Sequence, residues 1–154
     1  VVTGKPVPIG GSEGRTAAPA LFETTGEEFK ANPALHEEVF GPLGLVVRVS
    51  SLEEMRALAL ELDGQLTITL HMNDADVDAA RDLMPVLERK AGRLLANGFP
   101  TGVEVVDSMV HGGPYPASTN FGATSVGTLS IRRFLRPVSY QNLPEALLPE
   151  NAAE

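Results

Sequence analysis

The chain contains no cysteine and no tryptophan, and it has few aromatic or charged side chains. Aromatic residues make up 5% of its 154 residues and charged residues 21%. Without Cys there is no disulfide framework, thiolate metal site or cysteine nucleophile within the chain, which is compatible with the reducing cytoplasm where we expect the protein. No apolar run approaches the roughly 20 residues of a membrane span, so we expect no membrane contact.

Positive charge is also scarce. The chain has 12 Lys and Arg against 20 Asp and Glu, for a net charge of -8, and its basic residues form no cluster. A basic surface for a phosphate backbone is therefore missing, and we expect no nucleic-acid partner. What the sequence does contain is 43% hydrophobic residues in a length that suits one domain. It therefore predicts a globular protein with a buried core.

Four short apolar runs predict β-strands. Residues 43–49 (LGLVVRV) are typical of a strand buried on both faces of a parallel sheet, and residues 66–71 alternate between apolar and polar side chains. Further strands are predicted at residues 19–25 and 93–97. Short connections and helices between successive strands are typical of right-handed βαβ crossovers. We therefore predict an α/β fold with a mostly parallel sheet built from βαβ units.

Helix signals lie between these strands. Asn32-Pro33 predicts a helix start, and Ser51 with Glu54 forms a capping-box pair at the start of a second helix. The other signals predict a third helix. Asp74 or Asp76 would cap its start, Pro85 would kink or divide it, and Gly92 would end it.

The rest of the chain is richer in turn-forming residues. Residues 1–19 read as an irregular lead-in, and residues 98–127 as a long loop rich in Gly, Pro, Ser and Thr. Such loops inside a domain are uncommon unless they are functional or disordered, so we expect a binding loop. After it we predict a helical turn or two at residues 130–135, a last strand at 138–142 and a frayed tail after Leu148.

The segment HEEVFGP, residues 36–42, combines carboxylates, an aromatic ring and a Gly-Pro turn. Glu38 and Phe40 are two residues apart, so both can project to one side of an extended segment. A carboxylate can accept hydrogen bonds from two vicinal hydroxyls beside an apolar ring, which suits a ribose carrying an aromatic base. Alternatively, Glu38 is a solvated surface residue and Phe40 a core anchor. The wide spacing of the three histidines favours no metal site.

HEEVFGP resembles the Glu-x-Phe-Gly-Pro motif of the aldehyde dehydrogenase superfamily. The order of lead-in, strands, helices, the strand GRLLAN and a loop with a Gly-Gly pair is similar to the C-terminal third of that family. The resemblance implies that residues 1–136 are the C-terminal part of a catalytic domain and residues 137–154 an oligomerisation strand and tail. Residues 99–118 and 132–149 look most like the branch that acts on 2,5-dioxovalerate, which is α-ketoglutaric semialdehyde.

The resemblance also implies a function, the NAD- or NADP-dependent oxidation of an aldehyde to an acid by a longer, homo-oligomeric protein. Glu38 would hold the nicotinamide-ribose hydroxyls, and Phe40 would pack near the nicotinamide. The aldehyde channel would be lined by Pro100, Met109 and His111, where a His in place of the family's usual aromatic fits a semialdehyde bearing a carboxylate. Alternatively, His111 is a loop histidine bonded to the backbone. The family's nucleophilic Cys precedes this region, so we expect no catalytic residue here and no activity from the chain alone. The alternative is a non-catalytic α/β interaction module with the same fold.

Overall fold

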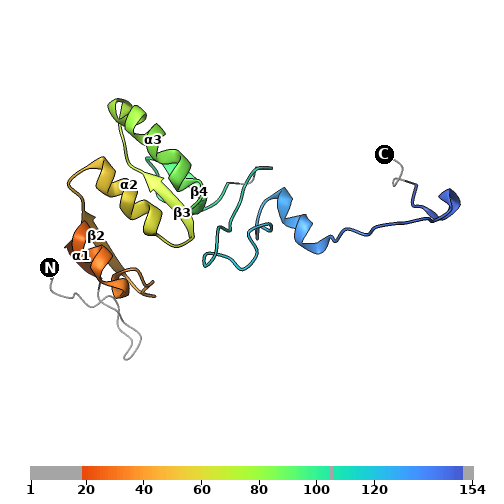
Figure 1. Cartoon of the computed structure of the whole chain (residues 1–154), viewed down its shortest axis with the longest axis horizontal. Helices are drawn as coiled ribbons and strands as arrows, with labels where there is room; N and C mark the ends of the chain where they lie inside the picture. The colour runs from red at the N-terminus through yellow and green to blue at the C-terminus, as the bar shows by residue number, and fades with distance from the viewer. Residues whose placement is uncertain (1–18, 105, 151–154) are drawn as a thin grey trace.

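The computed structural model describes residues 19–104 and 106–150, whose four strands form two separate parallel sheets (Figure 1). Strand β1 (Ala20–Thr25) pairs with β2 (Leu43–Arg48), and β3 (Gln65–Leu70) pairs with β4 (Ala91–Ala96). These four predicted strands are confirmed, and so is the parallel pairing within each sheet. The prediction of one sheet is not, because β2 and β3 do not pair and helix α2 carries the chain from one sheet to the other.

The connection between β1 and β2 contains a helix that we did not predict. Helix α1 (Gly26–Ala31) begins at Thr25, whose side chain accepts a 3.2 Å hydrogen bond from the backbone N–H of Glu28. Asn32 does cap a helix, as predicted, through a 3.2 Å bond from the Ala34 N–H. That helix is only the 3₁₀ turn η1 (Pro33–Leu35), so the segment that follows it is a loop.

The hydrophobic core lies between the β3–β4 sheet and two helices, α2 (Leu52–Glu61) and α3 (Val77–Leu87), which pack against each other. Figure 1 shows these helices side by side over that sheet. Helical spacing brings one group of apolar side chains on each helix to the face that meets the strands, while others, such as Leu52 and Leu60 of α2, remain exposed. The buried residues of this cluster are Ala59, Leu83, Val86 and Leu87, with Ile68, Leu70 and Leu94 of the sheet packed against them.

The start of α2 follows the predicted capping box with one change. The Ser51 hydroxyl accepts a 3.1 Å hydrogen bond from the Glu54 N–H, as expected. The Glu54 carboxylate bonds to Ser50 instead of Ser51, accepting from its backbone N–H and its hydroxyl at 2.7 Å each. These two bonds favour the charged carboxylate and hold the pKa of Glu54 below its ordinary value.

The start and end of the predicted third helix differ in detail from the prediction. Asp76 occupies the N-cap position of α3, as predicted, but makes no side-chain cap bond there; instead Asn73 and Asp76 form a reciprocal cap around the 3₁₀ turn η2 (Asp74–Asp76). Pro85 does not divide α3, which continues past it to Leu87. Gly92 does not end the helix but lies within β4.

Beyond residue 127 the chain leaves the strands and helices as an arm (Figure 1). The predicted helical turn is present as the 3₁₀ helix η3 (Thr128–Phe134), and a further turn, η4 (Glu145–Leu147), follows. The predicted strand at 138–142 is wrong, because this segment pairs with no strand within the described residues. The predicted lead-in lies almost wholly outside the described residues, as does the end of the tail. No helix in the described part is long and apolar enough to span a membrane.

Candidate functional site

A hollow of about 1010 Å³ brings together three of the five predicted site residues, and we call it the Glu38 hollow. Glu38 comes from the loop before β2, Pro100 from the segment after β4, and His111 from the long Gly-rich loop. These residues are far apart in sequence. Other residues that line the hollow include His36, Glu37, Asp63, Thr67, Arg93 and Pro116.

Glu38 and Phe40, the two predicted site residues of the loop 36–42, lie in different surroundings. The Glu38 side chain lines the hollow and is exposed, and no hydrogen bond or ion pair recorded among the described residues involves its carboxylate. Phe40 is 94% exposed, so it is not the core anchor of the alternative interpretation. Glu38 is thus open to a ligand in the hollow, and the Phe40 ring is open to a partner outside it.

Hydroxyl groups hold the loop that carries His111. The buried Thr124 hydroxyl accepts a 2.8 Å hydrogen bond from the His111 N–H and donates a 3.1 Å bond to the Val126 carbonyl. The Ser118 hydroxyl donates to the Gly113 carbonyl at 2.6 Å. The bonds to His111 are therefore made by its backbone, which leaves its exposed side chain at the hollow.

Glycines allow this loop to lie directly on the backbone at Gly64, which precedes β3, and at Gly92, the second residue of β4. A Cβ atom added to Gly92 would lie 2.0 Å from the carbonyl oxygen of Gly112, and one added to Gly64 would lie 2.0 Å from that of Pro114. Real Cβ atoms do not approach backbone that closely, so no side chain fits at either contact. These contacts fix the backbone on both sides of the Gly112-Gly113 pair against the sheet, immediately after His111.

Met109 lies apart from the other predicted substrate residues. It lines a smaller hollow of about 410 Å³, together with Gly92, Leu94 and Glu104. Arg93 lines both hollows and joins them. The structure therefore brings Glu38, Pro100 and His111 together in one hollow and places Met109 in a separate one, with Arg93 common to the two linings.

Arg93 is the cation of the Glu38 hollow that sequence reasoning missed. It is half-buried in β4, opposite Thr67 of β3 in the parallel register, and both side chains line the hollow. Three carboxylates line it too, from Glu37, Glu38 and Asp63, yet no ion pair of the described residues includes Arg93. The alternation of side chains along the two strands is the signal that could have identified Arg93. The same described residues contain no acidic or histidine cluster suited to a metal ion.

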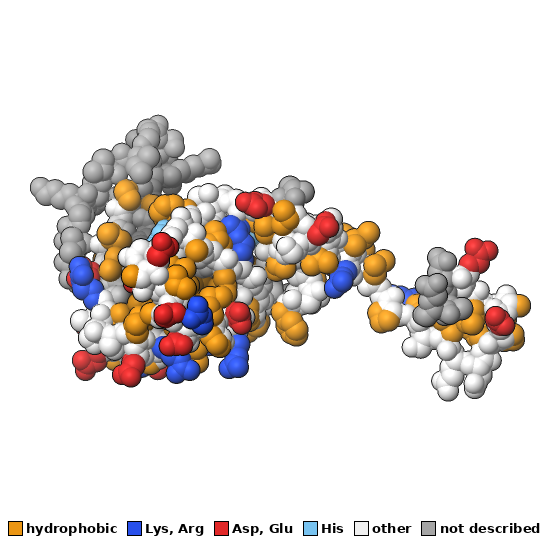
Figure 2. All heavy atoms as spheres, turned by 90° about the horizontal axis from the view of Figure 1, so that it is seen from above, with side chains coloured by type: hydrophobic (Ala, Val, Ile, Leu, Met, Phe, Trp, Pro, Cys, Tyr) orange, Lys and Arg blue, Asp and Glu red, His pale blue; other side chains and the backbone are white. Residues whose placement is uncertain are grey.

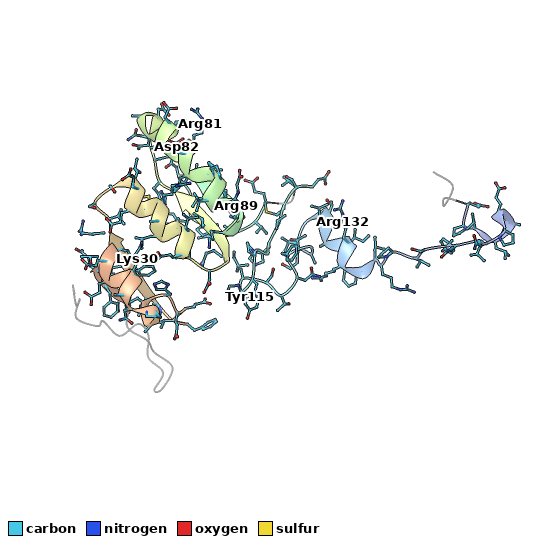
Figure 3. The ribbon with its side chains drawn as sticks, viewed as in Figure 1. Lys30, Arg81, Asp82, Arg89, Tyr115 and Arg132 are labelled. Atoms are coloured by element: carbon cyan, nitrogen blue, oxygen red, sulfur yellow. The ribbon has the colours of Figure 1, made fainter. Side chains whose placement is uncertain are left out.

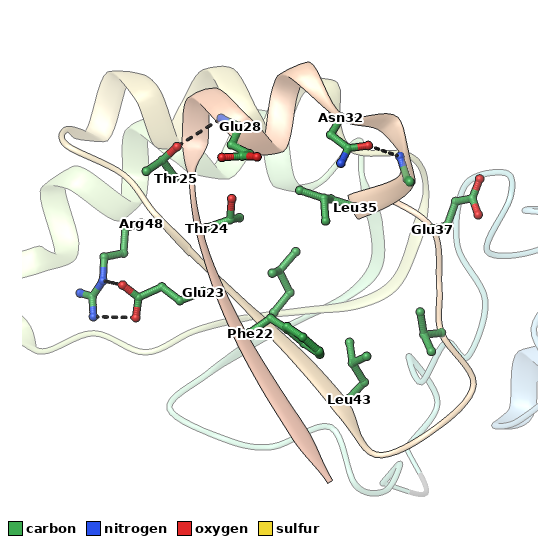
Figure 4. A pocket seen from close by; sticks show the side chains of 13 residues that line it. Phe22, Glu23, Thr24, Thr25, Glu28, Asn32, Leu35, Glu37, Leu43 and Arg48 are labelled. Atoms are coloured by element: carbon green, nitrogen blue, oxygen red, sulfur yellow. Dashed lines mark hydrogen bonds and ion pairs between the residues drawn. The ribbon is translucent and has the colours of Figure 1, made fainter. Parts of the chain in front are cut away.

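A second hollow, of about 660 Å³, lies on the β1–β2 sheet and contains no predicted site residue (Figure 4). At its side, the Arg48 guanidinium donates two hydrogen bonds to the Glu23 carboxylate, at 2.5 and 3.1 Å. This pairing lowers the pKa of Glu23 and raises that of Arg48. Figure 3 shows that this part, marked by Lys30 on α1, is well separated from Tyr115 on the segment between β4 and η3.

Comparison with known proteins identifies two related dehydrogenases. Alpha-ketoglutaric semialdehyde dehydrogenase 2 of Azospirillum brasilense is 56% identical over 138 residues, or 90% of this chain. Alpha-ketoglutaric semialdehyde dehydrogenase of Acinetobacter baylyi is 49% identical over 135 residues, or 87% of this chain. The chain spans 26% of the length of each. No protein-family model matches the sequence. The two relatives confirm the resemblance that the HEEVFGP motif indicated.

Proposed function

We propose that this relative of the semialdehyde dehydrogenases supplies part of the active site of a longer enzyme, which oxidises an aldehyde to an acid with NAD or NADP. The observation that carries the proposal is the Glu38 hollow. Glu38, Pro100 and His111 were predicted from separate segments, and all three line this hollow. In this proposal residues 1–136 are the C-terminal part of the catalytic domain.

Glu38 and Phe40 would hold the cofactor. The Glu38 carboxylate is exposed at the hollow and has no recorded bond to the described residues, so it can accept hydrogen bonds from the two hydroxyls of a ribose. The Phe40 ring is 94% exposed, and such a ring can pack against a flat heterocycle. These features fit the nicotinamide end of NAD or NADP. When bound, this group supplies an acceptor for the hydride that leaves the substrate carbon.

The aldehyde would enter beside His111 and Pro100, with Met109 lining the neighbouring hollow. His111 makes this mouth more polar than an aromatic side chain would, and Arg93 adds a positive charge to the hollow. Arg93 could pair with a carboxylate on the substrate, in competition with the carboxylates of Glu37, Glu38 and Asp63 that line the same hollow. The proposed reaction is therefore the oxidation of 2,5-dioxovalerate to 2-oxoglutarate, which the names of the two relatives support.

The Glu38→Gln variant is expected to weaken cofactor use and to leave the fold intact. Because hydrogen bonds to a charged group contribute about 1.5 to 3 kcal/mol, its loss should reduce kcat/KM for the cofactor roughly 10- to 100-fold. The measurement needs an active enzyme. One is a chimera in which this chain replaces the matching segment of the Azospirillum brasilense relative.

The matched control for this experiment is Glu37→Gln. Glu37 is adjacent to Glu38 and lines the same hollow, so its substitution removes the same charge from the same place. If the two variants lost equal activity, only the charge of the hollow would matter. If Glu38→Gln matched the parent in kcat and cofactor KM, Glu38 would be a solvated surface residue and its proposed role would be wrong.

We also propose that the arm joins two copies of the enzyme. Figure 2 shows hydrophobic side chains along the arm, which narrows away from the rest of the molecule. Phe134 is 74% exposed and Leu135 67%, and exposed apolar side chains of this kind favour association. We expect light scattering at micromolar concentration to detect a dimer or larger oligomer. Replacing both residues with Ser should produce a monomer. If the unsubstituted 154-residue chain were itself a monomer, the proposal would be wrong.

A further inference from the structure

The loop that carries Glu38 makes few bonds of its own. For residues 37–41, the structure records no hydrogen bond from a backbone N–H to any described residue. On one side of this stretch, the Pro42 carbonyl accepts a 2.9 Å bond from Ala20, which joins the loop to β1. The position of Glu38 therefore depends on the anchors at the two ends of the loop.

His36 provides the other anchor through its side chain. Its ring stacks on the ring of Phe29 in α1, with the centroids 4.1 Å apart and the planes 9° from parallel. Its Nε2 atom lies 2.8 Å from the Phe29 backbone carbonyl. Phe29 is one of the few buried hydrophobic residues outside the α2–α3 cluster. His36 thus connects the loop to a side chain and a carbonyl that are themselves held in place.

The chemistry of this contact fixes the protonation of one ring atom. A carbonyl oxygen only accepts hydrogen bonds, so Nε2 must carry the proton and donate it. Nε2 carries a proton both in this neutral tautomer and in the imidazolium ion, so the bond is compatible with either state. A neutral amide at this position could also donate to the same carbonyl, but it could not reproduce the ring stacking.

We propose that His36 is a positioning residue, which holds Glu38 at the hollow by anchoring residues 36–42 to Phe29. The structural part of this inference is independent of the proposed function, and its kinetic consequence depends on it. His36 acts through Glu38 and is not itself assigned to substrate or cofactor. This role could not be predicted from the sequence, because it depends on the tertiary contact between the His36 ring and Phe29 of α1.

Nuclear magnetic resonance of the 154-residue chain tests the anchor directly. We expect a proton on Nε2 of His36, and order parameters near about 0.85 for the amides of residues 37–40. His36→Ala should lower those order parameters below about 0.6, and His36→Gln should restore most of the loss through its amide donor. Hydrogen exchange in β3 and β4 should not change in either variant, which separates loosening of the loop from unfolding.

His71→Ala is the matched control. His71 also contacts a phenylalanine, Phe99, with ring centroids 5.5 Å apart, and its loss should leave residues 37–40 ordered. The inference is overturned if His36 carries its neutral proton on Nδ1, or if His36→Ala leaves the order parameters unchanged. It is also overturned if His71→Ala loosens the loop as much as His36→Ala does.

Kinetics of the chimera then connect the anchor to the proposed function. His36→Ala should raise the cofactor KM about two- to tenfold, as expected for one lost hydrogen bond, with a smaller change in kcat. His36→Gln should recover most of that loss. If the loop loosens in His36→Ala but Glu38→Gln has normal kinetics, the anchor is supported and the role of Glu38 is refuted. A loop that stays ordered refutes the anchor, whatever the kinetics of Glu38→Gln.

Discussion

The 154-residue chain by itself is expected to oxidise no aldehyde at a measurable rate with either NAD or NADP. Aldehyde dehydrogenases of the family that the motif resembles use a Cys thiolate to attack the carbonyl, and this chain has no Cys. Rate enhancements of 10⁶-fold or more require the full set of catalytic groups, of which a covalent nucleophile is a major part. In the proposed function the residues of the Glu38 hollow bind and orient the cofactor and substrate, and no Cys is among them to supply that thiolate.

The informative comparison is between the chain and the chimera. With 2,5-dioxovalerate as substrate, the absorbance of the reduced cofactor should rise with the chimera and stay flat with the chain. An inactive chimera that folds normally would show that this chain cannot complete the relative's active site. Turnover by the chain, in a preparation free of host dehydrogenases, would mean that its own residues include a catalytic centre.

Leu87→Ala is expected to produce the largest loss of stability among single substitutions in the core. Leu87 is 3% exposed and packs in the cluster between α2, α3 and the β3–β4 sheet. Removing such a side chain loses its transfer free energy and leaves a cavity. It should therefore lower the free energy of unfolding by about 2 to 5 kcal/mol. Urea denaturation followed by circular dichroism measures this change.

Leu60→Ala is the control for that substitution. Leu60 lies on α2 and is 48% exposed, so its loss should cost less than about 1 kcal/mol. Equal losses for the two variants would mean that the α2–α3 cluster is not the main core. A changed dependence of the unfolding free energy on urea concentration would indicate an altered unfolded or native state instead of a simple loss of packing.

Local signals in the sequence were sufficient for most of the secondary structure. Short apolar runs predicted the four strands, with β-branched residues at 43–49 and alternation at 66–71 as the clearest signals, and the Ser51 hydroxyl predicted the start of α2. The division into two sheets could not be predicted, because neither β2 nor β3 encodes its pairing partner locally. The prediction of a strand at 138–142 was wrong for a related reason. Alternating apolar residues form a β-strand only when a neighbouring strand is available for hydrogen bonding, and the described residues offer none to this segment.

The candidate site was predicted in part. Glu38 was predicted from the chemistry of the HEEVFGP segment and from the family resemblance, and Pro100 and His111 from the resemblance; all three line one hollow. Arg93 and His36 were missed because their positions depend on tertiary structure: Arg93 on the register of two parallel strands, and His36 on its contact with Phe29. Sequence spacing alone did not indicate either contact.

The contacts of Gly92 and Gly64 also limit how this protein can be engineered. The His111 loop is not a module that can be transplanted by itself, because the backbone on which it lies accepts no side chain at these two positions. In a scaffold with Ala or a larger residue at either position, the side chain would clash with the backbone of the transplanted loop. Moving this loop to another protein would therefore require moving the segments around Gly64 and Gly92 with it as one unit.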